Sequence, residues 1–163
     1  MPRRERSFTL LLLCILAQGC GAGALHVHAR AAMVTGSVLG QAGTLIVQAR
    51  REALDGVVVS TEGIPREERL AALEGAERAW QPAIVAHESA RLALFAWIDA
   101  IALADAVGSE EDVMLHVAEM VARLLLAWEP LAEAVQELGV DVPTLPDALR
   151  DLAYAIAEDR DGD

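Results

Sequence analysis

Apolar residues recur every three or four positions through most of this chain, and that spacing limits it to an all-helical fold. The clearest run lies between residues 113 and 138. A helix with this repeat buries one continuous stripe and packs against its neighbours at a shallow angle. The run consists of Val113, Val117, Met120, Leu124, Trp128, Leu131, Val135 and Leu138. We therefore expect an all-α chain that forms a small antiparallel helical bundle.

Glycine and proline residues divide the bundle into about four helices, some of them kinked. Pro65 and the two glutamates that soon follow it have the composition of a helix first turn. Pro82 either kinks that helix or starts the next one, and Pro130 is expected to bend the regular stretch described above. Gly108 and Gly139 each fit the position just after the end of a helix.

The first helix, expected from about His26 to Asp55, contains three glycines in its interior. Polar residues mark one side of it. The other side, which we expect to face inward, carries Met33, Gly36, Leu39, Gly40, Gly43, Ile46 and Val47. Each glycine costs about 1 kcal/mol relative to alanine in a helix, so we expect these glycines to allow a second helix to approach closely. A membrane-embedded dimer face is the alternative, but Arg30, Gln41 and Gln48 disfavour it.

The stretch Ala83–Val107 is apolar nearly all round the helix. This composition is typical of a central helix that is contacted on several sides. We expect its charged residues to share one narrow strip that faces solvent, made of Glu88, Arg91 and Asp99 together with Ala102. Asp105 lies on a different face from Asp99, so the two carboxylates do not form a catalytic pair.

The first twenty residues have the layout of a secretory signal. Residues 1–7 contain three arginines and one glutamate, residues 8–17 are almost entirely apolar, and small residues follow at once. The apolar run is too short for a membrane-spanning helix, which needs about 20 residues. We therefore expect the protein to be exported.

The residues Leu16-Ala17-Gln18-Gly19-Cys20 resemble the lipobox of bacterial lipoproteins, with Ala17 at the place where a branched aliphatic residue is usual. This resemblance covers residues 1–20 only. It implies that Cys20 receives a lipid on its sulfur, becomes the mature N-terminus and anchors the protein to a membrane, facing the periplasm or the cell exterior. Ala22-Gly23-Ala24 offers an ordinary signal-peptidase site instead, and cleavage near Ala24 releases a soluble secreted protein.

These features divide the chain into a signal peptide (1–19), a tether (20–28), a helical bundle domain (29–158) and a disordered acidic tail (159–163). The last helix of the bundle is expected near its C-terminal end, with Leu149, Leu152 and Ile156 facing inward. Cys14 and Cys20 are the two cysteines of the chain, so the domain after Cys20 cannot form an internal disulfide.

The charge of the chain disfavours nucleic acid as a partner. The formal net charge is −12, and it becomes −14 when residues 1–19, which carry a net charge of +2, are removed. Such an acidic domain repels polyphosphate. The remaining partners to consider are the membrane, reached through the lipid on Cys20, and either another envelope protein or a second copy of this chain.

No residue pattern in the chain indicates catalysis, a cofactor or a metal. His26 and His28 are two residues apart, which places them on opposed sides of a helix, and we expect them to lie in the solvated tether. His116 could join His87 in a metal site, but the Glu-x-x-His spacing of di-iron bundles is absent. We expect His116 to lie instead on a solvated helix face with ion pairs.

We therefore expect a non-enzymatic, lipid-anchored envelope protein with a protein-interaction or structural role. One alternative is a periplasmic carrier of a small ligand or metal, with its site in the core around Trp80, Trp97 and Trp128. A second alternative is a phage or mobile-element accessory protein that acts at the envelope.

Overall fold

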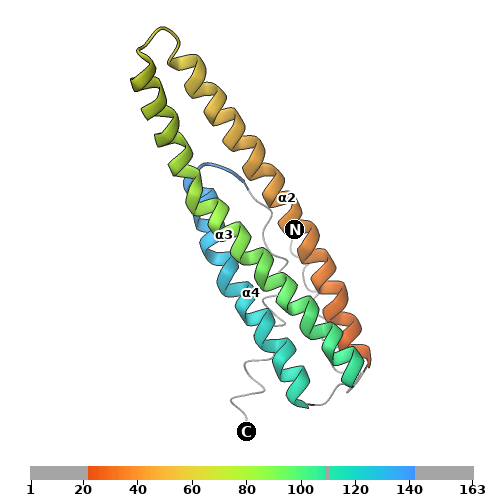
Figure 1. The fold of residues 1–163 in the computed structure, drawn as a ribbon. Coiled ribbons are helices and arrows are strands. Elements are labelled where there is room, and N and C mark those ends of the chain that lie inside the picture. The colour runs from red at the N-terminus through yellow and green to blue at the C-terminus, as the bar shows by residue number, and fades with distance from the viewer. Residues whose placement is uncertain (1–21, 109–110, 142–163) are drawn as a thin grey trace, which may run out of the picture.

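The computed structural model describes residues 22–108 and 111–141, and the regular structure in these two ranges is helical, without a strand. Three helices are present: α2 (Ala22–Ser60), α3 (Arg66–Val107) and α4 (Glu111–Glu137) (Figure 1). The predicted all-α fold is therefore confirmed. The predicted number of about four helices is not confirmed, because the expected C-terminal helix lies outside the described residues, as do the signal segment and Cys20.

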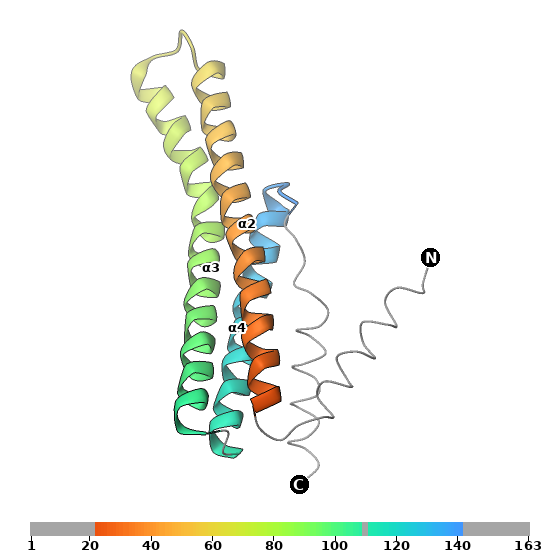
Figure 2. The ribbon, with the colours of Figure 1, turned by 90° about the vertical axis from the view of Figure 1, so that its right-hand side faces the viewer.

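The three helices run antiparallel in sequence order, and α3 packs against both α2 and α4 (Figures 1 and 2). α3 has 42 residues and α4 has 27. At 1.5 Å per residue, α3 is therefore about 22 Å longer than α4. As a result the α2–α3 hairpin projects beyond α4, and the turn that joins α2 to α3 lies at the far end of this projection.

The core forms where all three helices overlap. The stripe predicted for α4 is confirmed: its members from Val117 to Val135 are buried, and Val113 and Leu138 pack against the same cluster. Trp80, Trp97 and Trp128 are all buried in this cluster. The acidic first turn predicted after Pro65 is also present at the start of α3.

The buried face of α2 differs from the predicted one. Its buried residues alternate in steps of three and four and comprise Leu25, His28, Ala32, Thr35, Leu39, Ala42 and Ile46. Met33, Gly40 and Val47, which were expected to face inward, are exposed. Thr35 can be buried because its hydroxyl donates to the carbonyl oxygen of Ala31 at 2.9 Å, which satisfies its polar group.

Pro82 does not divide α3, which continues through it to Val107. Pro82 and Pro130 both lie on exposed sides of their helices. In that position, water can reach the carbonyl group that each proline leaves without a helical donor. The predicted helix ends are confirmed: Gly108 follows α3 with φ +100°, and Gly139 closes the end of α4 with φ +70°.

α2 begins at Ala22, inside the segment 20–28 that was expected to form a tether. His28 is buried, and its ring meets the ring of Trp97 edge to face, with 5.9 Å between centroids. Its Nδ1 has no hydrogen-bond partner among the described residues. Burial lowers the pKa of His28 below its ordinary value. Residues 22–28 are therefore helical, and the side chain of His28 belongs to the packed core.

We predict that His28→Phe reduces the loss of stability in acid. Because the folded chain lowers the pKa of His28, the unfolded chain binds its proton more readily. The free energy of unfolding should therefore fall as the pH drops below about 6.5, the ordinary value. Urea unfolding between pH 8 and pH 5 measures this slope. The exposed His26, changed to Phe, is the matched control. An unchanged slope in His28→Phe would mean that His28 is solvated, as in a tether.

Candidate functional site

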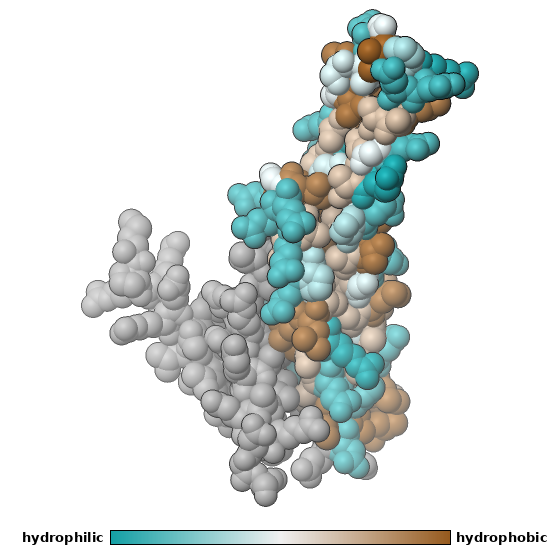
Figure 3. All heavy atoms as spheres, turned by 90° about the vertical axis from the view of Figure 1, so that its left-hand side faces the viewer, coloured by the Kyte–Doolittle hydropathy of each residue, from teal (hydrophilic) through white to brown (hydrophobic). Residues whose placement is uncertain are grey.

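An apolar groove of about 950 Å³ runs between α2 and α3, and none of the residues that line it comes from α4. Small residues of α2 form its floor, and larger apolar side chains form its walls. The walls include Met33 and Val47 from α2, and Ile84, Phe95 and Ile98 from α3. Met33 is 73% exposed. Figure 3 shows that hydrophobic side chains also reach the surface among hydrophilic ones along the described helices.

Three glycines of α2, Gly36, Gly40 and Gly43, line the groove, and two of them lie against side chains of α3. A Cβ atom added at Gly43 would lie 2.8 Å from the imidazole ring of His87, and one added at Gly36 would lie 3.6 Å from Cδ2 of Leu94. A Cβ at Gly40 would meet nothing within 4 Å. At Gly43 and Gly36 the near neighbours are side-chain atoms of α3, so the close approach of a second helix backbone stays a prediction. Gly40 faces the open groove.

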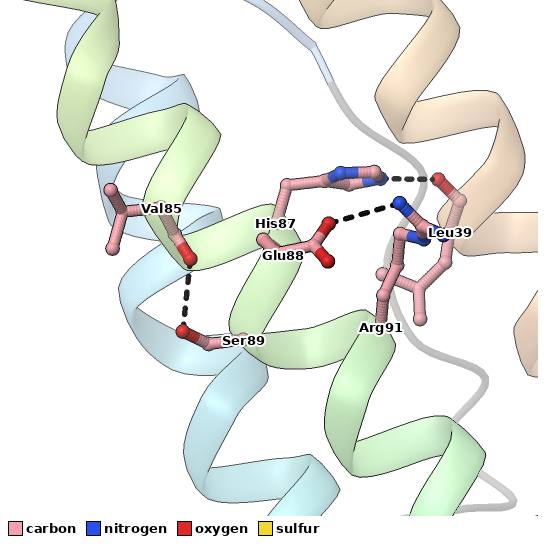
Figure 4. A network of polar contacts seen from close by, with 6 residues as sticks. All are labelled: Leu39, Val85, His87, Glu88, Ser89 and Arg91. Atoms are coloured by element: carbon pink, nitrogen blue, oxygen red, sulfur yellow. Dashed lines mark hydrogen bonds and ion pairs between the residues drawn. The ribbon is translucent and has the colours of Figure 1, made fainter.

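His87 spans the groove from α3 to α2. Its Nε2 lies 3.0 Å from the carbonyl oxygen of Leu39, as Figure 4 shows. A carbonyl oxygen can only accept, so Nε2 carries the proton and donates it. Residue 43 lies one helical turn after residue 39, so its Cβ would stand beside that carbonyl group. The missing Cβ of Gly43 thus opens the path by which His87 reaches the backbone of α2.

Charged residues lie next to His87 on the rim of the groove (Figure 4). Nη1 of Arg91 donates to Oε2 of Glu88 at 2.9 Å, and the guanidinium carbon lies 5.7 Å from the centre of the Phe95 ring. Exposed pairs of this kind contribute little stability. Glu88, Arg91, Asp99 and Ala102 are all exposed, which confirms the predicted solvent-facing strip of α3.

The histidines considered as metal ligands lie apart from one another. His87 points toward α2, whereas His116 lies on the exposed face of α4 with its Nδ1 3.9 Å from Oε2 of Glu119. Within residues 22–108 and 111–141, no three His, Cys, Asp or Glu residues lie close enough to hold a metal ion. The His116–Glu119 pair has the character that was predicted for a solvated helix face.

The three tryptophans that could form a carrier site lie in the core, and none of them lines the groove. The groove itself was not predicted from the sequence, because bulky apolar residues such as Met33 and Val47 were assigned to the buried face. Their position outside the three-and-four spacing of Leu25, His28 and Ala32 was the signal that could have revealed it.

α2 has a second property that bears on location. Its Leu25–Ser60 portion, near the N-terminus, is long and apolar enough to cross a membrane by length and composition alone, and 28% of its most apolar window is buried in the fold. Core helices of soluble proteins and signal sequences have the same composition. No protein-family model, curated protein or solved structure matches this chain.

We predict opposite effects of the same substitution at two glycines of α2. Gly40→Ala should raise the free energy of unfolding by about 1 kcal/mol, because alanine favours the helix and the added Cβ meets nothing. Gly43→Ala should give no gain or a loss, because the new methyl group displaces His87 from Leu39 and removes a hydrogen bond worth about 1 kcal/mol. Urea unfolding of both variants measures the difference.

The control is the same two glycine substitutions made in a chain that also carries His87→Ala. Without the imidazole ring, Gly43→Ala should stabilise the protein as much as Gly40→Ala does. Equal effects of the two substitutions in the presence of His87 would contradict the contact between His87 and the α2 backbone.

Proposed function

We propose that this chain is an exported, lipid-anchored envelope protein without enzymatic activity that binds another protein chain through the α2–α3 groove. The observation that carries this proposal is the groove, an apolar surface left open between two helices. Contiguous apolar surface is costly to leave in water, and on soluble proteins it commonly marks a binding site.

The shape of the groove favours a helix as its occupant. Its two walls are antiparallel helices, and its floor is open at Gly40, where an added Cβ would meet nothing within 4 Å. An amphipathic helix binds such a groove by burying one apolar stripe. Among the polar side chains that line the groove, His87, Arg91 and Thr44 already have partners within the chain, and the fourth, Gln48, is exposed. The groove therefore offers few free polar groups of the kind that orient a substrate or small molecule.

The location is supported by the order of charge, apolar run and small residues in the first twenty positions, and by the place of Cys20 in that order. α2 begins only two residues after Cys20. Cleavage near Ala24 would instead remove the first turn of α2. Lipid attachment at Cys20 keeps α2 whole, and for this reason we prefer it to release of a soluble protein.

We predict that Cys20→Ala moves the protein from the membrane fraction to the soluble fraction or leaves its precursor unprocessed. Globomycin, which blocks the lipoprotein signal peptidase, should make the precursor of the unaltered chain accumulate. Fractionation and the mass of the mature N-terminus provide the measurement. Unchanged mass and unchanged fractionation in Cys20→Ala would refute anchoring through this residue.

We predict that a photoreactive phenylalanine in place of Met33 forms an adduct of one defined mass in intact cells. Met33 lies in the groove and is 73% exposed, so the replacement leaves the core undisturbed. The matched control is the same replacement of Leu126, which is 70% exposed on α4. Gly40→Glu adds a charge to the groove at a position where the new Cβ meets nothing within 4 Å, and it should abolish the adduct. Equal labelling from both positions would contradict a specific groove.

A further inference from the structure

α2 and α4 pack on α3, and a further face of α3 is covered by neither of them. This face carries three large apolar side chains, Leu92, Phe95 and Ile98, of which Leu92 is the most exposed at 61%. Arg91 and Asp99 flank them and are also exposed. Leu92 and Asp99 lie on one side of Phe95, and Arg91 and Ile98 lie on the other, next to the groove. We refer to residues 88–102 of this face as the α3 stripe.

The α3 stripe is self-complementary when its direction is reversed. Counting outward from Phe95, Leu92 and Ile98 are both three residues away, so the reversed helix places an apolar residue at the level of an apolar residue. Arg91 and Asp99 are both four residues away and have opposite charges. A second α3 helix that runs antiparallel, centred on Phe95, therefore brings Arg91 to the level of Asp99 on the other helix, and does so twice.

We propose that the occupant of this face is a second copy of the chain, and that the two α3 helices pair antiparallel about a twofold axis at Phe95. This inference rests on the proposed function, since it identifies the partner at the groove side of α3. In a twofold contact, the same patch meets itself, as is usual in homodimers. Two Arg91–Asp99 pairs then lie about one turn to either side of the Phe95 rings, and Leu92 and Ile98 of each copy pack beside them.

Charge decides between this arrangement and a parallel one. In a parallel pair, Arg91 would meet Arg91 and Asp99 would meet Asp99, and like charges at close range repel. In the antiparallel pair, each Arg91 is placed between Glu88 of its own chain, at 2.9 Å, and Asp99 of the second copy. Such a network of opposite charges sets the direction and register of the contact, while the apolar centre supplies the burial.

The register gives a sharp test in the full chain, processed and kept in its own membranes. Phe95→Cys should give a covalent dimer with a short bis-maleimide, because the twofold axis brings the two sulfurs together. Val85→Cys is the matched control, since Val85 lies on the same helix and is 61% exposed. It lies ten residues from the centre, so its two copies are about 30 Å apart at 1.5 Å per residue. It should give no dimer. The unaltered chain shows the background from Cys20.

A charge reversal tests the direction of the pair. In the Phe95→Cys chain, Arg91→Asp should lower the yield of dimer severalfold, and adding Asp99→Arg should restore it, because both pairs are then rebuilt with exchanged signs. The proposal is overturned if both Phe95→Cys and Val85→Cys form a dimer, if only Val85→Cys does, or if neither does. Failure of the double reversal to restore the yield also overturns it.

The outcome also separates this inference from the proposed function. An adduct from position 33 with a different protein, together with no dimer from Phe95→Cys, would leave the binding groove standing and overturn self-association. The absence of both products would refute both.

Discussion

The close packing of α2 against α3 depends on small residues, and the rest of the structure depends on that packing. Ala32 and Ala42 are buried, and the missing side chain of Gly43 leaves room for the ring of His87 from α3 to reach the carbonyl oxygen of Leu39. The same smallness leaves too little side chain to fill the space on the solvent side of the contact, and the groove is the result. Larger residues on α2 would close the groove and push the helices apart.

The kinds of residue that are buried explain why the buried face of α4 was predicted correctly from the sequence and that of α2 was not. The buried stripe of α4 consists of large apolar residues such as Leu124 and Leu131, which stand out from their polar neighbours. The buried stripe of α2 contains Ala32, Thr35 and His28, whose burial depends on partners that only the tertiary structure supplies. Thr35, for example, satisfies its hydroxyl within its own helix.

The continuity of α3 and the open groove were missed for related reasons. A proline inside a helix costs about 3 kcal/mol, so Pro82 indicated either a kink or the start of a new helix. Trp80 and Ala83, on either side of Pro82, are buried, and the free energy gained by burying their apolar surface offsets the cost of the proline. The proline itself is exposed to water. The groove was missed because a sequence pattern assigns Met33 and Val47 to the interior by their hydrophobicity. The helix start after Pro65 and the helix ends at Gly108 and Gly139 were predicted correctly, because helix ends depend on local backbone geometry.

The projecting part of the α2–α3 hairpin requires less free energy to open than the packed part of the described helices. In α2, no residue beyond Ile46 is buried, and in α3 none before Trp80 is buried. The bidentate pair between Arg50 and Glu77, with Nε 2.9 Å from Oε2, joins the two helices there, but a half-exposed ion pair adds little. Local opening of this part therefore exposes little new apolar surface and requires far less free energy than global unfolding. Within the described residues, three packed helices form a body that is extended by two turn-linked helical arms, and these arms can fray and re-form while that body stays folded.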